Sequence, residues 1–172
     1  LAACGSTAAS SAASAADSTA SSAAESTAAS DTAAADGQTY KVGICQLVQH
    51  VALDAATQGF KDALTEQLGD AVTFEEKNAQ GDSNTCSTII NGFVSDNVDL
   101  ILANATPALQ AAQAGTNTIP VLGTSVTEYG VALGIDDFDG LVGTNISGTS
   151  DLAPLDEQAG IIKELFPDAK TV

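Results

Sequence analysis

Polar side chains suited to binding a small molecule follow the expected strands of this 172-residue chain. Three short segments hold neutral hydrogen-bonding residues, namely Gln46, Gln49, His50, Asn104, Thr106, Thr124, Ser125 and Thr127. Asp54 can pair with an amino group, and helices that start at about Ala52 and Thr106 offer backbone N–H groups to a carboxylate. Together these groups predict a site for a zwitterion such as an amino acid. Taken singly, Thr106 could be only a helix cap and Asp54 only a first-turn acid.

Catalytic chemistry is not expected from these residues. His50 is the single histidine, and the sequence has neither a GxSxG motif nor a cysteine beside His50, so a hydrolase triad cannot be assembled. We interpret His50 either as a ligand contact or as a hydrogen-bonding residue of its loop. The cysteines and His50 also lack the spacing of a zinc site. We therefore expect no catalytic residue, no metal and no cofactor.

Alternating strands and helices position the polar segments. Strands are expected over residues 40–45, 71–75, 98–103, 119–123, 131–135 and 143–146, and residues 170–172 are expected to begin another. Helices are expected over residues 52–68 with Gly69 as the stop, from Asp82 or Ser83 onward, from Thr106 as cap with Pro107 in the first turn, and over residues 154–166. This order predicts an α/β fold, an open parallel sheet with helices on both faces.

The polar segments share one edge of that sheet. In open parallel sheets, ligands bind beyond the carboxyl ends of the strands, where the strand order reverses. Each of the polar segments follows the carboxyl end of an expected strand. The zwitterion site is therefore expected at this edge.

The N-terminus has the pattern of a lipid anchor. Small residues precede Cys4 and Gly5 follows it, as at the end of a bacterial lipoprotein signal, so Cys4 is the expected lipidation site. Residues 5–38 consist mostly of Ala, Ser and Thr without large apolar residues, which predicts a disordered tether. We expect an extracytoplasmic protein held at the bacterial cell membrane by lipid on Cys4. The glycosylation sequon at Asn104-Ala105-Thr106 carries little meaning in such a protein.

The charge of the chain argues against polyanionic partners. The sequence has 22 acidic and 5 basic residues, a formal net charge of −17. A phosphate backbone or an anionic bilayer would repel such a chain. Nucleic-acid binding is therefore not expected, and membrane attachment would depend on Cys4.

Two further cysteines lie in the expected folded region. Cys45 ends a strand that is expected to be buried, and Cys86 lies on an expected helix. In an exported chain they could form a disulfide, or they could remain small buried thiols.

Short sequence blocks between Tyr40 and Val172 form a specific combination. They are Val42-Gly43-Ile44-Cys45-Gln46, His50-Val51-Ala52-Leu53-Asp54, Gly59-Phe60, Asn78-Ala79-Gln80-Gly81-Asp82, Asp99-Leu100-Ile101-Leu102-Ala103, Ala105-Thr106-Pro107-Ala108, Ser125-Val126-Thr127 and Gly148-Thr149-Ser150-Asp151. Together they resemble the substrate-binding lipoproteins of the tryptophan/tyrosine ABC-uptake family. The resemblance implies a type I periplasmic-binding-protein fold, in which two α/β lobes close on a ligand, often an aromatic amino acid.

The resemblance also implies roles for particular residues and partners. The ligand contacts expected in the first lobe are Gln46, His50, Asp54, Thr106, Thr124 and Ser125, with backbone from Ala105 and with Asp151 on the hinge side. The implied partners are an amino acid and ABC permease subunits, and we expect a monomer. A sensory or docking lipoprotein, which presents the same lobe to a membrane receptor, is the alternative. Neighbouring genes for a permease and an ATPase would favour uptake.

The sequence departs from the family pattern in two places. Val51 stands where the family has proline, which predicts a looser loop after His50. The sequence stops at Val172, where the second lobe of the family would begin. We therefore expect the first ligand-binding lobe over residues 39–150, then a hinge and crossover helix over residues 151–172 that lead into a missing second lobe.

Overall fold

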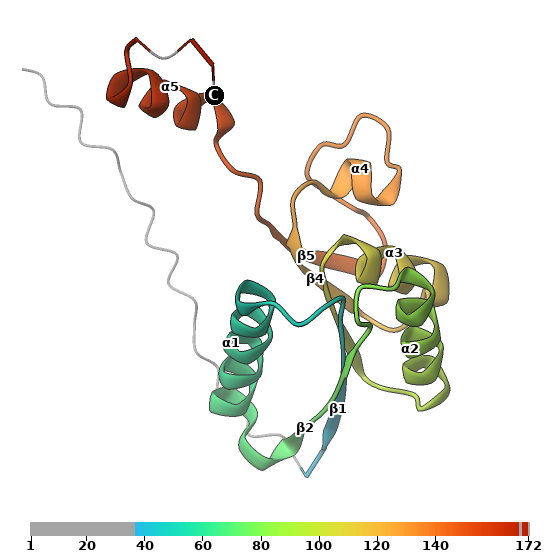
Figure 1. The fold of residues 1–172 in the computed structure, drawn as a ribbon. Coiled ribbons are helices and arrows are strands. Elements are labelled where there is room, and N and C mark those ends of the chain that lie inside the picture. The colour runs from blue at the N-terminus through green and yellow to red at the C-terminus, as the bar shows by residue number, and fades with distance from the viewer. Residues whose placement is uncertain (1–36, 169, 172) are drawn as a thin grey trace, which may run out of the picture. The chain divides into compact units, whose positions relative to one another are not determined.

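The computed structural model describes residues 37–168, 170 and 171, which contain one five-stranded sheet (Figure 1). Cys4 and nearly all of the expected tether lie outside the described residues. The strands are β1 Tyr40–Gln46, β2 Val72–Asn78, β3 Leu100–Asn104, β4 Val121–Val126 and β5 Ile146–Ser150. The helices are α1 Val51–Leu68, α2 Ser83–Ser95, α3 Thr106–Gly115, α4 Tyr129–Leu133 and α5 Leu155–Leu165, and a 3-10 turn, Gly69–Ala71, follows α1.

The strands of the sheet are all parallel, in the order β2-β1-β3-β4-β5. The chain makes β2 on one side of β1 and then crosses to make β3 on the other side. This reversal places the switch point of the sheet between β1 and β3. The register sets Gln46 beside Asn104 and Asn104 beside Thr124, so a row of polar residues crosses the carboxyl edge of the sheet.

Helices cover both faces of the sheet (Figure 1), as the alternating pattern predicts. Helix α1 lies on one face, where Phe60 and Leu64 pack against a cluster that includes Ile44. Helices α2 and α3 lie on the other face, with Phe93 and Leu109 in the larger core cluster. Side chains alternate along a strand, so neighbouring residues of β1 supply both clusters. The predicted fold class is therefore confirmed.

Local signals define the ends of α1 and α2 as expected. Helix α1 ends at Gly69, whose φ of 56° is one that glycine adopts without strain. Asp82 caps α2, where its Oδ1 accepts a hydrogen bond from the Thr85 N–H at 2.6 Å. This hydrogen bond holds the pKa of the Asp82 carboxyl below its usual value.

Two of the expected strands are wrong in type or position. Residues 131–135 belong to α4 and the turn after it, because both carboxylate oxygens of Glu128 cap the backbone N–H groups of Gly130 and Val131. Val131 is 83% exposed, so it does not belong to a buried strand. The strand expected over residues 143–146 begins only at Ile146, where β5 pairs with β4.

The last helix is present but has no buried face among the described residues. Helix α5 lies within the expected range, yet Leu155, Ile161, Ile162 and Leu165 are all exposed. Lys170 and Thr171 do not form the expected strand, and Val172 lies outside the described residues. None of the helices in the described ranges has the length and apolar character that a bilayer crossing requires.

A close contact between β1 and α2 depends on a glycine. Gly43 lies in β1 and faces the ring of Phe93, which is fully buried. A Cβ atom at Gly43 would lie 2.7 Å from two carbons of that ring. Because two core clusters meet at β1, the position of α2 depends on the absence of a side chain at this position.

We predict that Gly43→Ala lowers the free energy of unfolding by about 1–3 kcal/mol, the usual scale of overpacking. The matched control is Gly59→Ala in α1, where an added Cβ meets nothing within 4 Å. That change should raise stability by about 0.5–1 kcal/mol, because alanine loses less backbone entropy in a helix. Urea unfolding of both variants checks the prediction, and equal effects would contradict it.

Candidate functional site

A polar patch marks the carboxyl edge of the sheet on the α1 face. There the side chains of β1, β3 and β4 change from apolar to polar at Gln46, Asn104 and Thr124. Gln46 is 3% exposed and Asn104 is 0% exposed. The buried part of this patch therefore lies at the switch point itself, between β1 and β3.

Gln46 connects the end of β1 to the first turn of α1. Its side-chain Nε2 donates to the carbonyl of Val48 at 3.0 Å and to Oδ1 of Asp54 at 2.6 Å. The structure thus brings together two of the expected ligand contacts. Asp54 is exposed and has no salt-bridge partner among the described residues.

Thr57 and Asn104 extend this contact into the interior. Thr57 donates to Oε1 of Gln46 at 2.7 Å, and Asn104 Nδ2 donates to Thr57 Oγ1 at 2.9 Å and to the carbonyl of Leu53 at 2.8 Å. Asn104 Oδ1 is buried and has no hydrogen-bond partner in the described part of the chain. Asn104 therefore joins α1 to the end of β3.

The turn from β3 into α3 has a strained backbone. Ala105 adopts φ 91° and ψ 157°, a region that is essentially reserved for glycine. Its N–H donates to the carbonyl of Thr124 at 3.0 Å, and its carbonyl accepts from Leu109. Two of the expected contacts, Ala105 and Thr124, are therefore neighbours through their backbones.

Thr106 does not cap α3, in contrast to the expectation. The cap position belongs to Ala105, which makes no side-chain cap hydrogen bond. The reason is the unusual backbone of Ala105, which places Thr106 inside the helix. Within the described part of the chain, the first N–H groups of α3 therefore have no capping side chain, and the partial positive charge of the helix end suits an anion there.

Ser125 lies in a break of the β4 ladder. Its φ is 55°, and the pairing of β4 with β5 is irregular between Gly123 and Val126. Thr124, just before it, makes a long hydroxyl contact of 3.5 Å with Thr149. The irregularity turns the end of β4 at the edge where β3 also ends.

His50 and Asp151 have local roles in the structure. His50 caps α1, because its Nδ1 accepts from the N–H of Ala52 at 3.2 Å. Asp151 follows β5, and its N–H donates to the carbonyl of Val126 at 3.0 Å. Neither residue has a side-chain hydrogen bond to Gln46 or Thr124 among the described residues. Their roles in ligand binding remain predictions.

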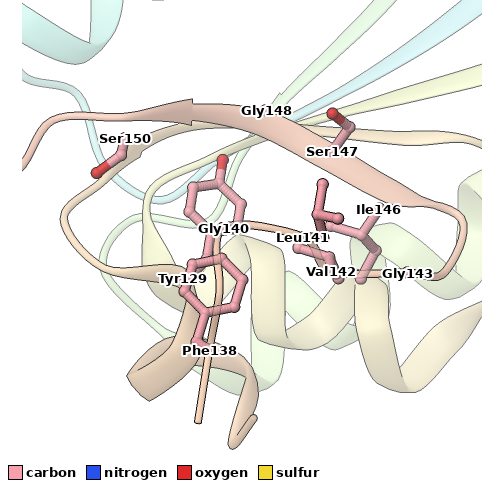
Figure 2. Close-up of a pocket in the computed structure, with 10 residues that line it drawn as sticks. All are labelled: Tyr129, Phe138, Gly140, Leu141, Val142, Gly143, Ile146, Ser147, Gly148 and Ser150. Atoms are coloured by element: carbon pink, nitrogen blue, oxygen red, sulfur yellow. The ribbon is translucent and has the colours of Figure 1, made fainter.

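Two hollows of about 330 Å³ each border β5, and one of them reaches the polar patch at Thr124. The hollow that includes Thr124 lies between α1 and the sheet, with Phe60 and Leu122 in its wall. Figure 2 shows the other, where Tyr129 and Phe138 lie below β5. Neither hollow is lined by Gln46 or Asp54.

Tyr129 supports β5 from below. Its hydroxyl donates to the carbonyl of Thr149 at 3.3 Å, and Figure 2 shows it directed at the strand. Side chains at Gly123 or Gly148 would collide with this hydroxyl, so both glycines are required for its close approach. Burial, and to a lesser extent the charge of Asp151, raises the pKa of Tyr129, which keeps the phenol a donor.

Cys45 and Cys86 are buried free thiols. Cys45 comes directly before Gln46, on the opposite face of the sheet. Burial raises the pKa of both thiols, and the neighbouring Cys86 adds to the rise at Cys45. Such thiols are inert packing residues in the reduced protein.

The polar groups at this edge can bind a small ligand. The described residues contain no cluster of three or more His, Cys, Asp or Glu side chains that could hold a metal ion. The edge offers amides, hydroxyls, backbone N–H groups and one carboxylate. These are the groups that fix the orientation of a small polar ligand.

The sequence prediction missed Thr57 and did not include Asn104 among the contacts. Thr57 lies on the stripe of α1 that also carries Leu53 and Phe60, where a polar residue among apolar ones was a usable signal. Asn104 ends a nearly continuous apolar strand and is fully buried. A buried polar residue at a strand end calls for partners.

Comparison with known proteins gives one consistent family. Residues 41–172 match the family model described as ABC transporter substrate binding protein. The chain is 41% identical over 134 residues to a tyrosine-binding protein of Clostridioides difficile strain R20291, covering 76% of this chain and 39% of the relative.

Two solved structures have the same fold as the chain. One is a ligand-free, open substrate binding protein with adhesive properties from Clostridium difficile, with 41% identity, a TM-score of 0.68 and coverage of 77% of this chain and 45% of that chain. The other is an ABC domain in complex with L-Trp from Streptococcus pneumoniae, with 32% identity and a TM-score of 0.70. The match covers 76% of this chain and 45% of that chain. The chain spans less than half the length of each of these relatives.

We predict that Ala105→Gly raises the free energy of unfolding by about 1 kcal/mol, because glycine adopts the backbone of Ala105 without steric strain. The control is Ala63→Gly at an exposed position of α1, which should lower stability by about 0.5–1 kcal/mol. Thermal and urea unfolding compare the two variants. A loss of stability at both positions would show that Ala105 is not strained.

Proposed function

The chain belongs to the ABC transporter substrate-binding protein family, and we propose that it carries the first ligand-binding lobe of an ABC importer's extracytoplasmic solute-binding component. The observation that carries this proposal is that the helices that follow the two strands of the switch point, α1 and α3, begin with two unlike groups. Asp54 supplies a carboxylate, and the first turn of α3 supplies N–H groups without a side-chain cap. Asn104 joins the two elements, because it comes just before Ala105 and bonds to the carbonyl of Leu53.

The proposed ligand is an amino acid with an aromatic side chain. A zwitterion presents a carboxylate and an ammonium group, which match the α3 N-terminus and Asp54. Support for an aromatic side chain comes from the relative named as a tyrosine-binding protein and from the similar domain in complex with L-Trp. We propose a binding role without catalysis.

The remaining expected contacts complete the polar surroundings of the ligand in this proposal. Thr124 and Ser125 offer hydroxyls, Gln46 contributes through its amide, which holds Asp54, and Ala105 and Thr106 offer backbone at the α3 N-terminus. His50 lies at the α1 end of the edge and Asp151 on the hinge side. A second lobe, in the part of the relatives that this chain does not span, would close over the ligand and exclude water.

The proposed protein acts at the outer surface of the membrane. A lipid on Cys4 would hold it at the membrane, and residues 5–38 would act as a tether. We propose that the protein is a monomer. Its protein partners would be the ABC permease subunits that receive the ligand. The tether would let the lobe reach the permease while it stays attached.

We predict that L-tyrosine, L-tryptophan or L-phenylalanine stabilises the full-length protein. A ligand at 100 times its Kd should add about 2.7 kcal/mol to the free energy of unfolding. Thermal-shift measurements with the twenty amino acids check this, with L-lysine and glycine as controls. The absence of a shift with every aromatic amino acid would remove the aromatic assignment.

The same measurement tests the α3 and β4 contacts. Thr106→Ala should leave α3 intact, because the Thr106 side chain does not cap the helix. Thr106→Ala and Thr124→Ala should weaken binding several-fold, on the scale of one hydrogen bond. Unchanged affinity in both variants would show that these side chains do not touch the ligand.

We predict that Cys4→Ser releases the protein from the membrane fraction. The change removes the thiol that would carry the lipid, and the acidic chain has no charge-based attraction to an anionic bilayer. Cell fractionation and labelling with a fatty acid check the prediction, with Cys45→Ser as the matched cysteine control. Membrane retention of Cys4→Ser would contradict it.

A further inference from the structure

A continuous chain of hydrogen bonds runs from the interior to the rim of the candidate site. It begins at Asn104 Nδ2, passes through the Thr57 hydroxyl to Gln46 Oε1, and continues from Gln46 Nε2 to Asp54 Oδ1. The successive distances are 2.9, 2.7 and 2.6 Å. The first three residues are buried, and the last is exposed.

Backbone carbonyls fix the orientation of both amides in this chain. A carbonyl oxygen can only accept, so the atom of Gln46 that faces the carbonyl of Val48 must be its nitrogen. By the same reasoning, the nitrogen of Asn104 faces the carbonyl of Leu53. The opposite orientation of either amide would set two acceptors against each other.

The direction of the Thr57 hydroxyl follows from these two amides. It accepts from Asn104 and must therefore donate its single hydrogen to Gln46. Both hydrogens of the Gln46 amide are then engaged, one by Val48 and one by Asp54. The series of hydrogen bonds therefore has only one possible order of donors and acceptors. It ends with an N–H of Gln46 that donates to Oδ1 of Asp54.

We propose that Thr57 and Asn104 are positioning residues, which hold the Gln46 amide so that it fixes the Asp54 carboxylate for the ammonium group of an amino-acid ligand. This inference rests on the proposed function. Asp54 has no salt-bridge partner among the described residues, so its charge is available to a ligand cation. Asn104 also anchors the turn that leads to the opposite pole of the site, the N-terminus of α3.

A purely structural role would make a different prediction. If these hydrogen bonds only fastened α1 to the sheet, their loss would weaken the binding of every ligand equally. If they position Asp54, their loss affects ligands that carry an ammonium group and spares those that lack one. The two roles are separated by comparing L-tyrosine with its des-amino analogue, 3-(4-hydroxyphenyl)propanoate.

The test uses Thr57→Val and Thr57→Ser in the full-length protein. Valine keeps the shape of threonine and removes the hydroxyl, while serine keeps the hydroxyl. Calorimetry should show L-tyrosine binding about tenfold more weakly to Thr57→Val, on the scale of one hydrogen bond to a charged group. The des-amino analogue should bind both variants as it binds the wild type, and Thr57→Ser should restore L-tyrosine binding.

A second variant keeps the test decisive if Thr57→Val does not fold. Asp54→Asn should abolish the preference of the protein for L-tyrosine over the des-amino analogue, because the partner of the ammonium group is gone. If Thr57→Val does fold, the double variant that carries Thr57→Val and Asp54→Asn should bind L-tyrosine as weakly as Asp54→Asn alone. Additive losses would show that Thr57 does not act through Asp54.

Four outcomes would overturn the inference. They are equal losses for both ligands in Thr57→Val, an unchanged preference in Asp54→Asn, additive losses in the double variant, or no retention of L-tyrosine binding in Thr57→Ser. A wild-type protein that binds neither L-tyrosine nor its analogue would instead remove the proposed function itself. The two failures are therefore distinguishable.

Discussion

The fold has to bury polar side chains at the switch point of its sheet, and their need for partners organises the surrounding chain. Leaving one such group unpaired costs about 1–3 kcal/mol, which is a large part of the stability of a small domain. Gln46, Thr57 and the amide nitrogen of Asn104 meet this need through one another and through the carbonyls of Val48 and Leu53. Only Asn104 Oδ1 of this group is left without a hydrogen-bond partner among the described residues. The hydrogen bonds hold the start of α1, the loop before it and the end of β3 in one arrangement.

Backbone strain gathers at the same edge. Ala105 follows β3 in a conformation that favours glycine, and Ser125 bends β4 through the left-handed region. The two strands are joined there by the hydrogen bond from Ala105 to Thr124. Strain of this kind persists only where the surroundings hold it, and it concentrates at sites that bind ligands. The regular part of the sheet thus ends where the proposed ligand contacts begin.

The sequence predicted the fold class because the apolar patterns of β1, β3 and α1 are strong and agree with one another. It failed where a local interaction outweighs the pattern. Glu128 caps α4 with both carboxylate oxygens, so an apolar run that looked like a strand became a helix. At the site, Gln46 and Asp54 could be found from their positions after a strand and in a first helical turn. The backbone of Ala105 and the hydrogen bonds of Thr57 could not, since both depend on how distant segments pack.

The burial of Asn104 has a consequence for how this protein can be produced. Asn104, Ala105 and Thr106 spell an acceptor sequence for N-linked sugar, and Asn104 is fully buried in the folded lobe. In a eukaryotic secretory pathway, a glycan attached to the growing chain would sit on the amide that bonds to Leu53 and Thr57. Such a chain could not close its interior around that residue. A bacterial or cell-free host without this modification is the compatible choice for expression.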